Sequence, residues 1–272
     1  MTEMNDMNGI VDGLLDAKAQ ARTVPLLTAA EPSFTLSAAY GVADEIRRRR
    51  LAAGETACGY KIGFTNRGIW DRYGIHAPIW GPIWDTTVES VENGEATVSL
   101  APFVQPRLEP EIMFCFERRP KAGMRENELA ECLRWVAHGY EIVHTHFSDW
   151  RFKAPDTVAD FALHGRLFVG PRVEIARFSD PAAQLASIRV VLERDGTTVE
   201  EGHASIVLGG PLTALRLWID AMFSQPERWP IVSGDIVSTG TITDAAPMAP
   251  GQRWQTRLSD DRLPGLALVT RP

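Results

Sequence analysis

Apolar residues recur at helical spacing in the first fifth of the chain. Ile10, Leu14 and Ala17 fall on one helical stripe. A second stripe begins near Leu36 and ends near Gly54, a residue type that commonly follows the last turn of a helix. The pattern predicts a small N-terminal helical region over about residues 1–55.

From "CGYKIGF" onward, short apolar runs alternate with turns that contain Gly, Pro and Asp. In "ASIRVVLERDGTTVEEG", the pair Asp195-Gly196 is typical of a two-residue hairpin turn. Two segments interrupt the strands with helical spacing, "ENELAECLRWVA" and "PLTALRLWIDAMF". We therefore expect an α+β protein whose residues 56–272 form one β-rich body.

Two glutamates stand one residue apart in "PRLEPEIMFCF". On a strand, Glu109 and Glu111 share one face, so their like charges lie close together. Such a pair is tolerable on a solvent-facing sheet, but beside a buried apolar run it needs a cation. Pro110 cannot donate to a β-ladder, so the segment is predicted to be an edge strand or to begin at a bulge.

Glu141 in "HGYEIVHTHFSDW" is a candidate third carboxylate. Three converging carboxylates would form an oxygen site suited to Mg²⁺ or Mn²⁺, although glutamate pairs are also common on exposed strands. His144 and His146 would share a strand face, which suggests zinc, but Glu141 would point away from both. A polar supporting role is the simpler interpretation of these histidines.

Lys61 lies in the short apolar run "GYKIGF". Burial would lower its pKa toward neutrality and make it usable in proton transfer, unless a carboxylate such as Asp85 held it charged. An edge lysine whose amine reaches solvent is the alternative. The segment "STGTIT" offers hydroxyl groups and glycine-exposed amides as a possible cradle for a ligand carboxylate.

Composition and missing motifs narrow the classes of function. A formal charge of −7 argues against nucleic acid as a partner, and the one basic run, "RRRR" at 47–50, is expected to be a solvated helix end. The cysteines are odd in number and form no CxxC pair, which indicates a reducing compartment. The N-terminus is acidic and no long apolar window is present, so we expect a cytoplasmic protein without a membrane span. No phosphate loop, dinucleotide fingerprint or GxSxG motif is present, which disfavours nucleotide enzymes and serine hydrolases.

Several segments taken in order resemble one family. "GYKIGFT", "PRLEPEI", "YEIVHTHFSDWRFKAPDTVAD", "GGPLTALRLW" and "SGDIVSTGTITDAAPMAPGQ" are similar to the 2-oxopent-4-enoate (vinylpyruvate) hydratases and 4-oxalocrotonate decarboxylases. This family lies within the fumarylacetoacetate hydrolase superfamily. The similarity extends from about residue 10 to the end, and its specificity resides in the ordered set.

The resemblance implies a mixed β-roll body of the fumarylacetoacetate hydrolase C-terminal type, with a small N-terminal helical region. It also implies a divalent ion, Mg²⁺ or Mn²⁺, on Glu109, Glu111 and Glu141, with Lys61 and Asp85 as the proton-transfer pair. The expected substrate is a small 2-oxo acid from aromatic degradation. Substrate-binding candidates are Thr239, Gly240, Thr241, Lys153 and His164.

The chain departs from the family pattern near the expected pocket. Hydratases often have "EIVDSRI" and "DNAS" where this chain has "EIVHTHF" and "DFALHG". His144, His146 and His164 therefore distinguish this chain from that pattern and put substrate choice in question. Arg151 and Lys153 could bind a second carboxylate, as the decarboxylase branch would need, or could be ordinary surface cations.

Four functions remain open from the sequence. Water addition to a 2-hydroxypenta-2,4-dienoate type of acid is the main hypothesis, and decarboxylation of 2-oxohex-3-enedioate is the near alternative. Hydrolysis of a carbon–carbon bond in an acylpyruvate would require a base such as His144. A non-catalytic binding or partner subunit is the fourth. The family also implies a homo-oligomer and suggests a complex with a pathway partner enzyme.

Overall fold

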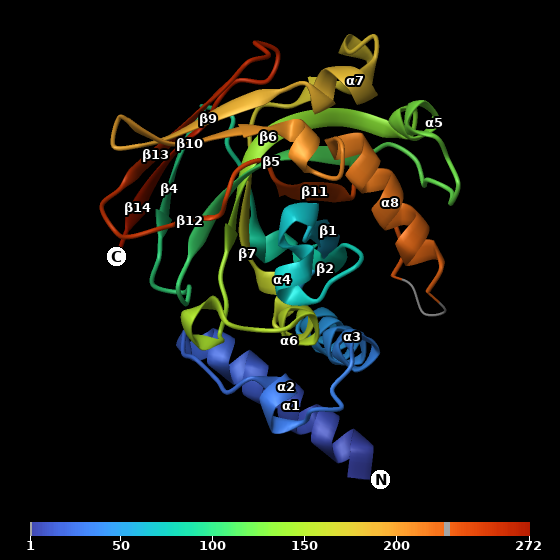
Figure 1. The fold of residues 1–272 in the computed structure, drawn as a ribbon, viewed down its shortest axis with the longest axis vertical. Coiled ribbons are helices and arrows are strands. Elements are labelled where there is room, and N and C mark those ends of the chain that lie inside the picture. Colours follow the sequence, from blue (N-terminus) through green and yellow to red (C-terminus); the bar gives the residue numbers. More distant parts are fainter. Residues whose placement is uncertain (1, 226–228) are drawn as a thin grey trace.

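Two β-sheets form the body of the protein, and three N-terminal helices lie below it in the view of Figure 1. The structure is a computed structural model that describes residues 2–225 and 229–272. Helix α8 runs alongside the larger sheet, and the smaller sheet lies at the opposite side. This mixed architecture confirms the α+β prediction.

The described strands belong to a nine-stranded and a five-stranded sheet. Their bounds are β1 Ala57–Gly63, β2 Ile79–Trp84, β3 Val88–Ser90, β4 Glu95–Ser99, β5 Arg107–Phe116, β6 Leu133–Val143, β7 His164–Val169, β8 Val173–Glu174, β9 Arg189–Arg194, β10 Thr197–His203, β11 Ile236–Thr241, β12 Ala246–Pro247, β13 Arg253–Leu258 and β14 Ala267–Arg271. The described α-helices are α1 Thr2–Gln20, α2 Leu27–Ala30, α3 Leu36–Ala52, α4 Trp70–Tyr73, α5 Glu126–Ala130, α6 Ala154–Ala159, α7 Pro181–Ala186 and α8 Pro211–Phe223.

The larger sheet has the order β2-β1-β11-β5-β6-β7-β3, with β12 pairing with β5 and β8 pairing with β6. The smaller sheet has the order β10-β9-β13-β14-β4. Strands β5 and β6 therefore lie at the centre of the larger sheet. Strand β11, which pairs with β5, is more than one hundred residues away from it along the chain, so the centre of the sheet is built from segments that are distant in sequence.

Helices α1 and α3 match the predicted N-terminal helices, and Gly54 follows α3 with a φ of 93°. Asp156 in α6 attaches this region to the body. Its carboxylate accepts hydrogen bonds from the backbone amide and the hydroxyl of Thr28, at 2.9 and 2.7 Å. The proposed division at residue 55 remains a prediction.

The hairpin and the later helix were predicted correctly. Strands β9 and β10 pair through a turn at Asp195 and Gly196, both of which have positive φ. Helix α8 begins at Pro211, whose ring suits the first turn.

The helix predicted over "ENELAECLRWVA" is wrong in its second half. Helix α5 ends at Ala130, and the apolar residues Leu133 and Val136 belong to β6. Pairing with both β5 and β7 satisfies the backbone of β6 and buries its side chains on both faces. This non-local pairing outweighs the local helical spacing.

Strand β5 is central rather than the edge strand that Pro110 suggested. The Pro110 carbonyl accepts from the Ile242 amide, so the missing Pro110 donor faces the β11 side of the ladder. There the pairing between β11 and β5 shifts between Ser238 and Thr241. A bulge in the neighbouring strand thus accommodates the proline.

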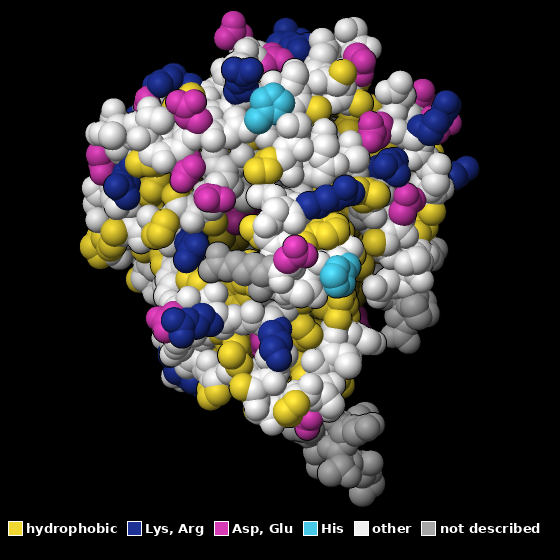
Figure 2. Space-filling view, viewed as in Figure 1, with side chains coloured by type: hydrophobic (Ala, Val, Ile, Leu, Met, Phe, Trp, Pro, Cys, Tyr) yellow, Lys and Arg dark blue, Asp and Glu magenta, His cyan; other side chains and the backbone are white. Residues whose placement is uncertain are grey.

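Charged side chains of both signs are dispersed over the face of the molecule drawn in Figure 2, with apolar side chains between them. The three cysteines are free thiols, as their spacing predicted. None of the helices in the described ranges combines the length and the apolar character that a bilayer span needs.

We expect Gly139→Ala to destabilise the fold by about 1–3 kcal/mol, because the added Cβ would overpack the centre of the sheet. It would lie 2.2 Å from the Phe168 carbonyl oxygen and 2.6 Å from the end of the Met113 side chain. Urea denaturation measures the loss. Gly13→Ala is the control, since its Cβ meets open space in α1. Equal stability of the two variants would contradict the close packing at Gly139.

Candidate metal centre

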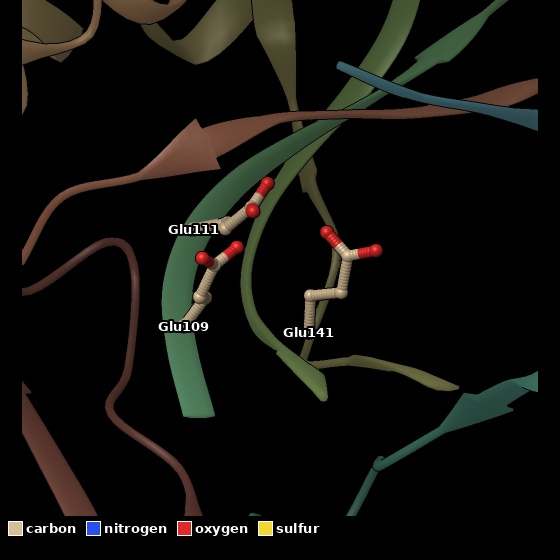
Figure 3. A group of neighbouring side chains, drawn as sticks. All are labelled: Glu109, Glu111 and Glu141. Carbon is tan, nitrogen blue, oxygen red and sulfur yellow. The ribbon is translucent and has the colours of Figure 1, made fainter. Parts of the chain in front are cut away.

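The pairing of β5 with β6 brings the three predicted carboxylates together. Glu109 lies directly opposite Glu141, and Glu111 lies opposite Gly139. Residues opposite each other in an antiparallel pair share one face, so all three carboxylates project to the same side of the sheet. Figure 3 shows the carboxylates of two neighbouring strands pointing toward one another.

The donor set fits a hard divalent cation. One carboxylate oxygen from each glutamate lies within 4.8 Å of the others. Glu111 and Glu141 are completely buried. Among the described side chains, Glu111 Oε1 and Glu141 Oε2 are buried oxygens without a hydrogen-bond partner. Buried anionic oxygens need compensation, and Mg²⁺ and Mn²⁺ prefer such oxygen ligands.

Lys61 is buried beside this cluster. Its Nζ lies 3.4 Å from Glu141 Oε2, and only 3% of the residue is exposed. Burial opposes the charged form, but the nearby carboxylates of Glu141, Glu109 and Glu111 outweigh it and raise the lysine pKa. Lys61 is therefore an ammonium that can donate a proton, not the neutral amine that burial alone would produce.

The structure does not bring Asp85 to Lys61. Lys61 pairs with Gly81 in β2, whereas Asp85 follows the far end of that strand. The Asp85 carboxylate is exposed and accepts hydrogen bonds from the backbone amides of Thr56 and Thr86. The carboxylate partner expected for Lys61 is thus Glu141, and we assign no proton-transfer role to Asp85.

The pKa values of the three glutamates are shifted in different directions. Burial raises the pKa of Glu109 to about 7, and burial together with the charges of Glu141 and Glu109 raises that of Glu111 well above its ordinary value. Burial acts in the same direction on Glu141, but Lys61 and His164 outweigh it and lower its pKa. Without a metal, the cluster therefore holds protons near neutral pH.

The bulge in β11 completes the cluster. It frees the Gly240 amide from the ladder, and this amide donates to Glu111 Oε2 at 2.8 Å. Gly240 has a φ of 100°, and a Cβ there would lie 1.8 Å from Thr65 Oγ1, so only glycine fits. Thr239 is buried, and its hydroxyl donates to the Ile112 carbonyl.

A cavity of about 560 Å³ opens beside the carboxylates. Lys61, Glu109, Gly240 and Thr241 lie in its wall. Much of the remaining wall is apolar or aromatic, including Ile62, Phe64, Ile79, Trp150, Phe152 and Trp254. The size and lining suit a small organic acid with an unsaturated carbon chain.

Several predicted ligand-binding residues lie outside this wall. Thr239 faces the sheet interior, Lys153 is exposed, and His164 is buried behind Glu141. Gly240 and Thr241 remain candidates for substrate contact. The corrections have one cause, because proximity in the sequence to a pocket segment does not fix which side of the backbone a side chain occupies.

Two cavity arginines were missed in the sequence. Arg107 lies at the start of β5, and its guanidinium sits 4.2 Å from the centre of the Trp150 ring. Arg194 comes from β9 of the smaller sheet. In "QPRLEPE", Arg107 precedes Glu109 by two residues and so shares its strand face, and this spacing could have indicated Arg107 as a cavity residue. No local signal indicated Arg194.

His144 and His146 follow β6 and do not join the carboxylates. His144 Nδ1 accepts from the Val104 amide, and His146 Nδ1 lies 2.5 Å from Asp160 Oδ1. Both rings are buried and meet edge to face. These contacts agree with a supporting polar role and not with a zinc site shared with Glu141.

We expect the affinity of the protein for Mn²⁺ to rise as the pH approaches about 7 from below, by about tenfold per pH unit for each proton that the metal displaces. The Glu109 pKa is raised in the folded protein, so folding binds protons, and the metal must displace them. The same shift makes the metal-free fold lose stability as pH rises from the ordinary glutamate range toward 7. Isothermal titration in two buffers checks proton release, and pH-independent affinity would contradict it.

Known proteins that are similar to this chain align with it over most of their length. A 2-hydroxyhexa-2,4-dienoate hydratase of Comamonas testosteroni is 30% identical over 243 residues, which cover 89% of each chain. A 4-oxalocrotonate decarboxylase of Pseudomonas sp. (strain CF600) is 28% identical over 249 residues, covering 91% of each. No protein-family model matches the chain.

A solved structure agrees with these relatives. The 4-oxalocrotonate decarboxylase from Pseudomonas putida G7, complexed with magnesium and adipate, superposes with a TM-score of 0.88 at 25% identity and 98% coverage of both chains. The chain belongs to the family of 2-oxopent-4-enoate hydratases and 4-oxalocrotonate decarboxylases within the fumarylacetoacetate hydrolase superfamily.

Proposed function

We propose that this protein is a metal-dependent lyase that adds water to a small unsaturated 2-oxo acid of the 2-hydroxypenta-2,4-dienoate type. The observation that carries the proposal is the three-carboxylate cluster, in which Glu111 and Glu141 are fully buried, with the Lys61 ammonium beside it, at the wall of a cavity that is partly apolar and partly polar. Names of relatives support the reaction class, since both hydratases and decarboxylases of aromatic degradation occur among them.

Glu109, Glu111 and Glu141 are the residues that would hold Mg²⁺ or Mn²⁺. When bound there, the ion would supply Lewis-acid stabilisation of negative charge on the 2-oxo group and the adjacent carboxylate. The three glutamates alone carry up to three negative charges and would repel such a substrate. The three glutamates can therefore bind a 2-oxo acid only when a cation neutralises their charge.

Lys61 is the proton carrier in this proposal. Its ammonium is held charged by the carboxylates and lies in the cavity wall. It would deliver its proton to the carbon chain of the dienol, and the proton lost by the enol oxygen would return to the Lys61 amine, after which water adds across the remaining carbon–carbon double bond. Atoms balance because the product contains one water more than the substrate.

The apolar walls would bind the hydrocarbon end of the substrate. Ile62, Ile79 and Phe64 exclude water from the reacting chain except where it enters from the cavity mouth. A short uncharged chain end would pack against these three side chains, as the hydratase function requires.

Decarboxylation of a dicarboxylic 2-oxo acid is the second candidate. Arg107 and Arg194 line the same cavity and could bind a distal carboxylate. They take the place that Lys153 and Arg151 had in the sequence-based hypothesis, because both of those side chains are exposed. Each reaction uses the same stabilised enolate, so the carboxylate cluster does not distinguish them.

The other two alternatives have less support. None of the described cavity-lining residues is a histidine, and His144 is buried elsewhere, so the base suggested for carbon–carbon bond hydrolysis is not in place. A non-catalytic subunit would not require a buried lysine among buried acids. We also propose, from the family resemblance, that the protein is a cytoplasmic homo-oligomer that associates with a pathway partner enzyme.

We expect the Mg²⁺-loaded protein to consume 2-hydroxypenta-2,4-dienoate without releasing CO₂. Loss of the conjugated chromophore and trapping of CO₂ are the two measurements. Incubation with 2-oxohex-3-enedioate provides the contrast, and CO₂ release from it would move the assignment to the decarboxylase. Inertness toward both acids would overturn the lyase proposal.

We expect Lys61→Met to reduce turnover by at least about 100-fold while the affinity for Mn²⁺ is retained, because the variant removes a proton donor and not a ligand. Glu111→Gln is the matched contrast, which should lose metal affinity and turnover together. Steady-state kinetics and Mn²⁺ titration separate the two effects. Weaker metal binding in Lys61→Met than in Glu111→Gln would reverse the assigned roles.

A further inference from the structure

His164 makes a direct contact with one of the three carboxylates. Its Nδ1 lies 2.7 Å from Glu141 Oε1, and the two residues are 2% and 0% exposed. The other oxygen of Glu141 faces Lys61. His164 therefore fixes one side of the Glu141 carboxylate and leaves Oε2 toward the cluster.

The hydrogen-bond directions follow from the chemistry of the partners. An ionised Glu141 only accepts, so Nδ1 of His164 carries the proton and donates to it. In the neutral ring, Nε2 is then an acceptor. Thr87 Oγ1 lies 2.8 Å from Nε2 and 3.1 Å from the Trp84 carbonyl oxygen, and its one hydroxyl proton serves the shorter contact because the unprotonated Nε2 has none to donate, while the Trp84 amide donates to the same Oγ1 at 3.2 Å. This chain of three residues fixes the tautomer and the orientation of the imidazole.

A bulge in β7 places His164 on the correct face. Glu141 pairs with Leu167 and Ile142 with Arg166, but Val143 pairs with His164 and not with Gly165. The extra residue turns His164 to the face that Val143 shares with Glu141. Gly165 suits the bulge, because a Cβ there would lie 2.7 Å from the Ile142 carbonyl oxygen.

The turn before β7 is also specialised. Phe161, Ala162 and Leu163 have φ values of 55°, 51° and 64°, a left-handed run that is unfavourable for residues other than glycine. Hydrogen bonds hold the turn, with the Leu163 amide donating to Asp160 and the Leu163 carbonyl accepting from His144. The fold thus maintains an unfavourable backbone conformation in the three residues directly before His164.

We propose that His164, oriented by Thr87, is a positioning residue that holds the Glu141 carboxylate in the geometry required for metal binding. This inference rests on the metal centre of the proposed function. It replaces the substrate-binding role predicted for His164, whose ring does not line the cavity. Hydrogen bonds of this kind commonly set ligand orientation, and their loss typically weakens metal affinity about 10–100-fold.

The test compares Mn²⁺ affinity, measured by the electron paramagnetic resonance signal of free Mn²⁺, across four variants. His164→Leu removes both hydrogen bonds and should weaken binding about 10–100-fold. His164→Asn retains an amide donor near the Nδ1 position and should restore most of the affinity. Thr87→Val keeps the side-chain volume but removes the hydroxyl, and should weaken binding by a smaller factor.

His144→Gln is the matched control, because His144 is equally buried and adjacent to the same turn but contacts no carboxylate of the cluster. It should bind Mn²⁺ like the unchanged protein, even if its thermal stability falls. Unchanged affinity in His164→Leu, or equal losses in His164→Leu and His164→Asn, would overturn the proposal. If His164→Leu does not fold, Thr87→Val decides, and wild-type affinity in that variant counts against it.

Failure of the proposed function produces different results. An unchanged protein that binds no Mn²⁺ would overturn the metal centre and this inference with it. A protein that binds Mn²⁺ with the predicted variant order, but converts neither acid, would overturn the lyase proposal while supporting the role of His164.

Discussion

The convergence of three carboxylates, two of them fully buried, against an apolar sheet is the constraint on which the site depends. Glu111 and Glu141 have no exposed surface, and Met113 and Ile83 form an apolar cluster on the same side of the sheet. Like charges at such a place repel strongly because little water screens them. The surroundings compensate only in part, through Lys61, the Gly240 amide and His164. A divalent ion would supply the remaining positive charge.

Each compensating group comes from a different strand. Lys61 lies on β1, Gly240 on β11 and His164 on β7, and they flank β5 and β6 from both sides. Two of these strands deliver their group through an irregularity, since the pairing shifts beside Gly240 and beside His164. Regular pairing would satisfy the backbone equally well, but it would leave the amide in the ladder and the imidazole on the wrong face.

The two sheets contribute different residues to the site. The larger sheet holds the charged cluster, and the smaller sheet contributes Arg194 and Trp254 to the lining of the cavity. Contacts between the sheets are both polar and apolar. Tyr140 of β6 donates to the Leu266 carbonyl, and Leu108 packs in a cluster with Trp254. Residues of both sheets therefore line the cavity in which we propose that the substrate binds.

The sequence by itself indicated the carboxylate cluster, because the alternation of side chains along a strand puts Glu109 and Glu111 on one face. Glu141 and Lys61 were candidates from their own apolar runs, and the resemblance of ordered segments implied their roles. The sequence also determined the N-terminal helices, α8 and the hairpin at Asp195-Gly196, where local spacing and turn chemistry act within a few residues. Only the tertiary structure decided that Glu141 and not Asp85 pairs with Lys61, that β6 is a strand, and that His164 supports a carboxylate. These outcomes depend on strand register and bulges between segments far apart in the chain, and a one-residue shift in register, which no local pattern records, moves a side chain to the opposite face.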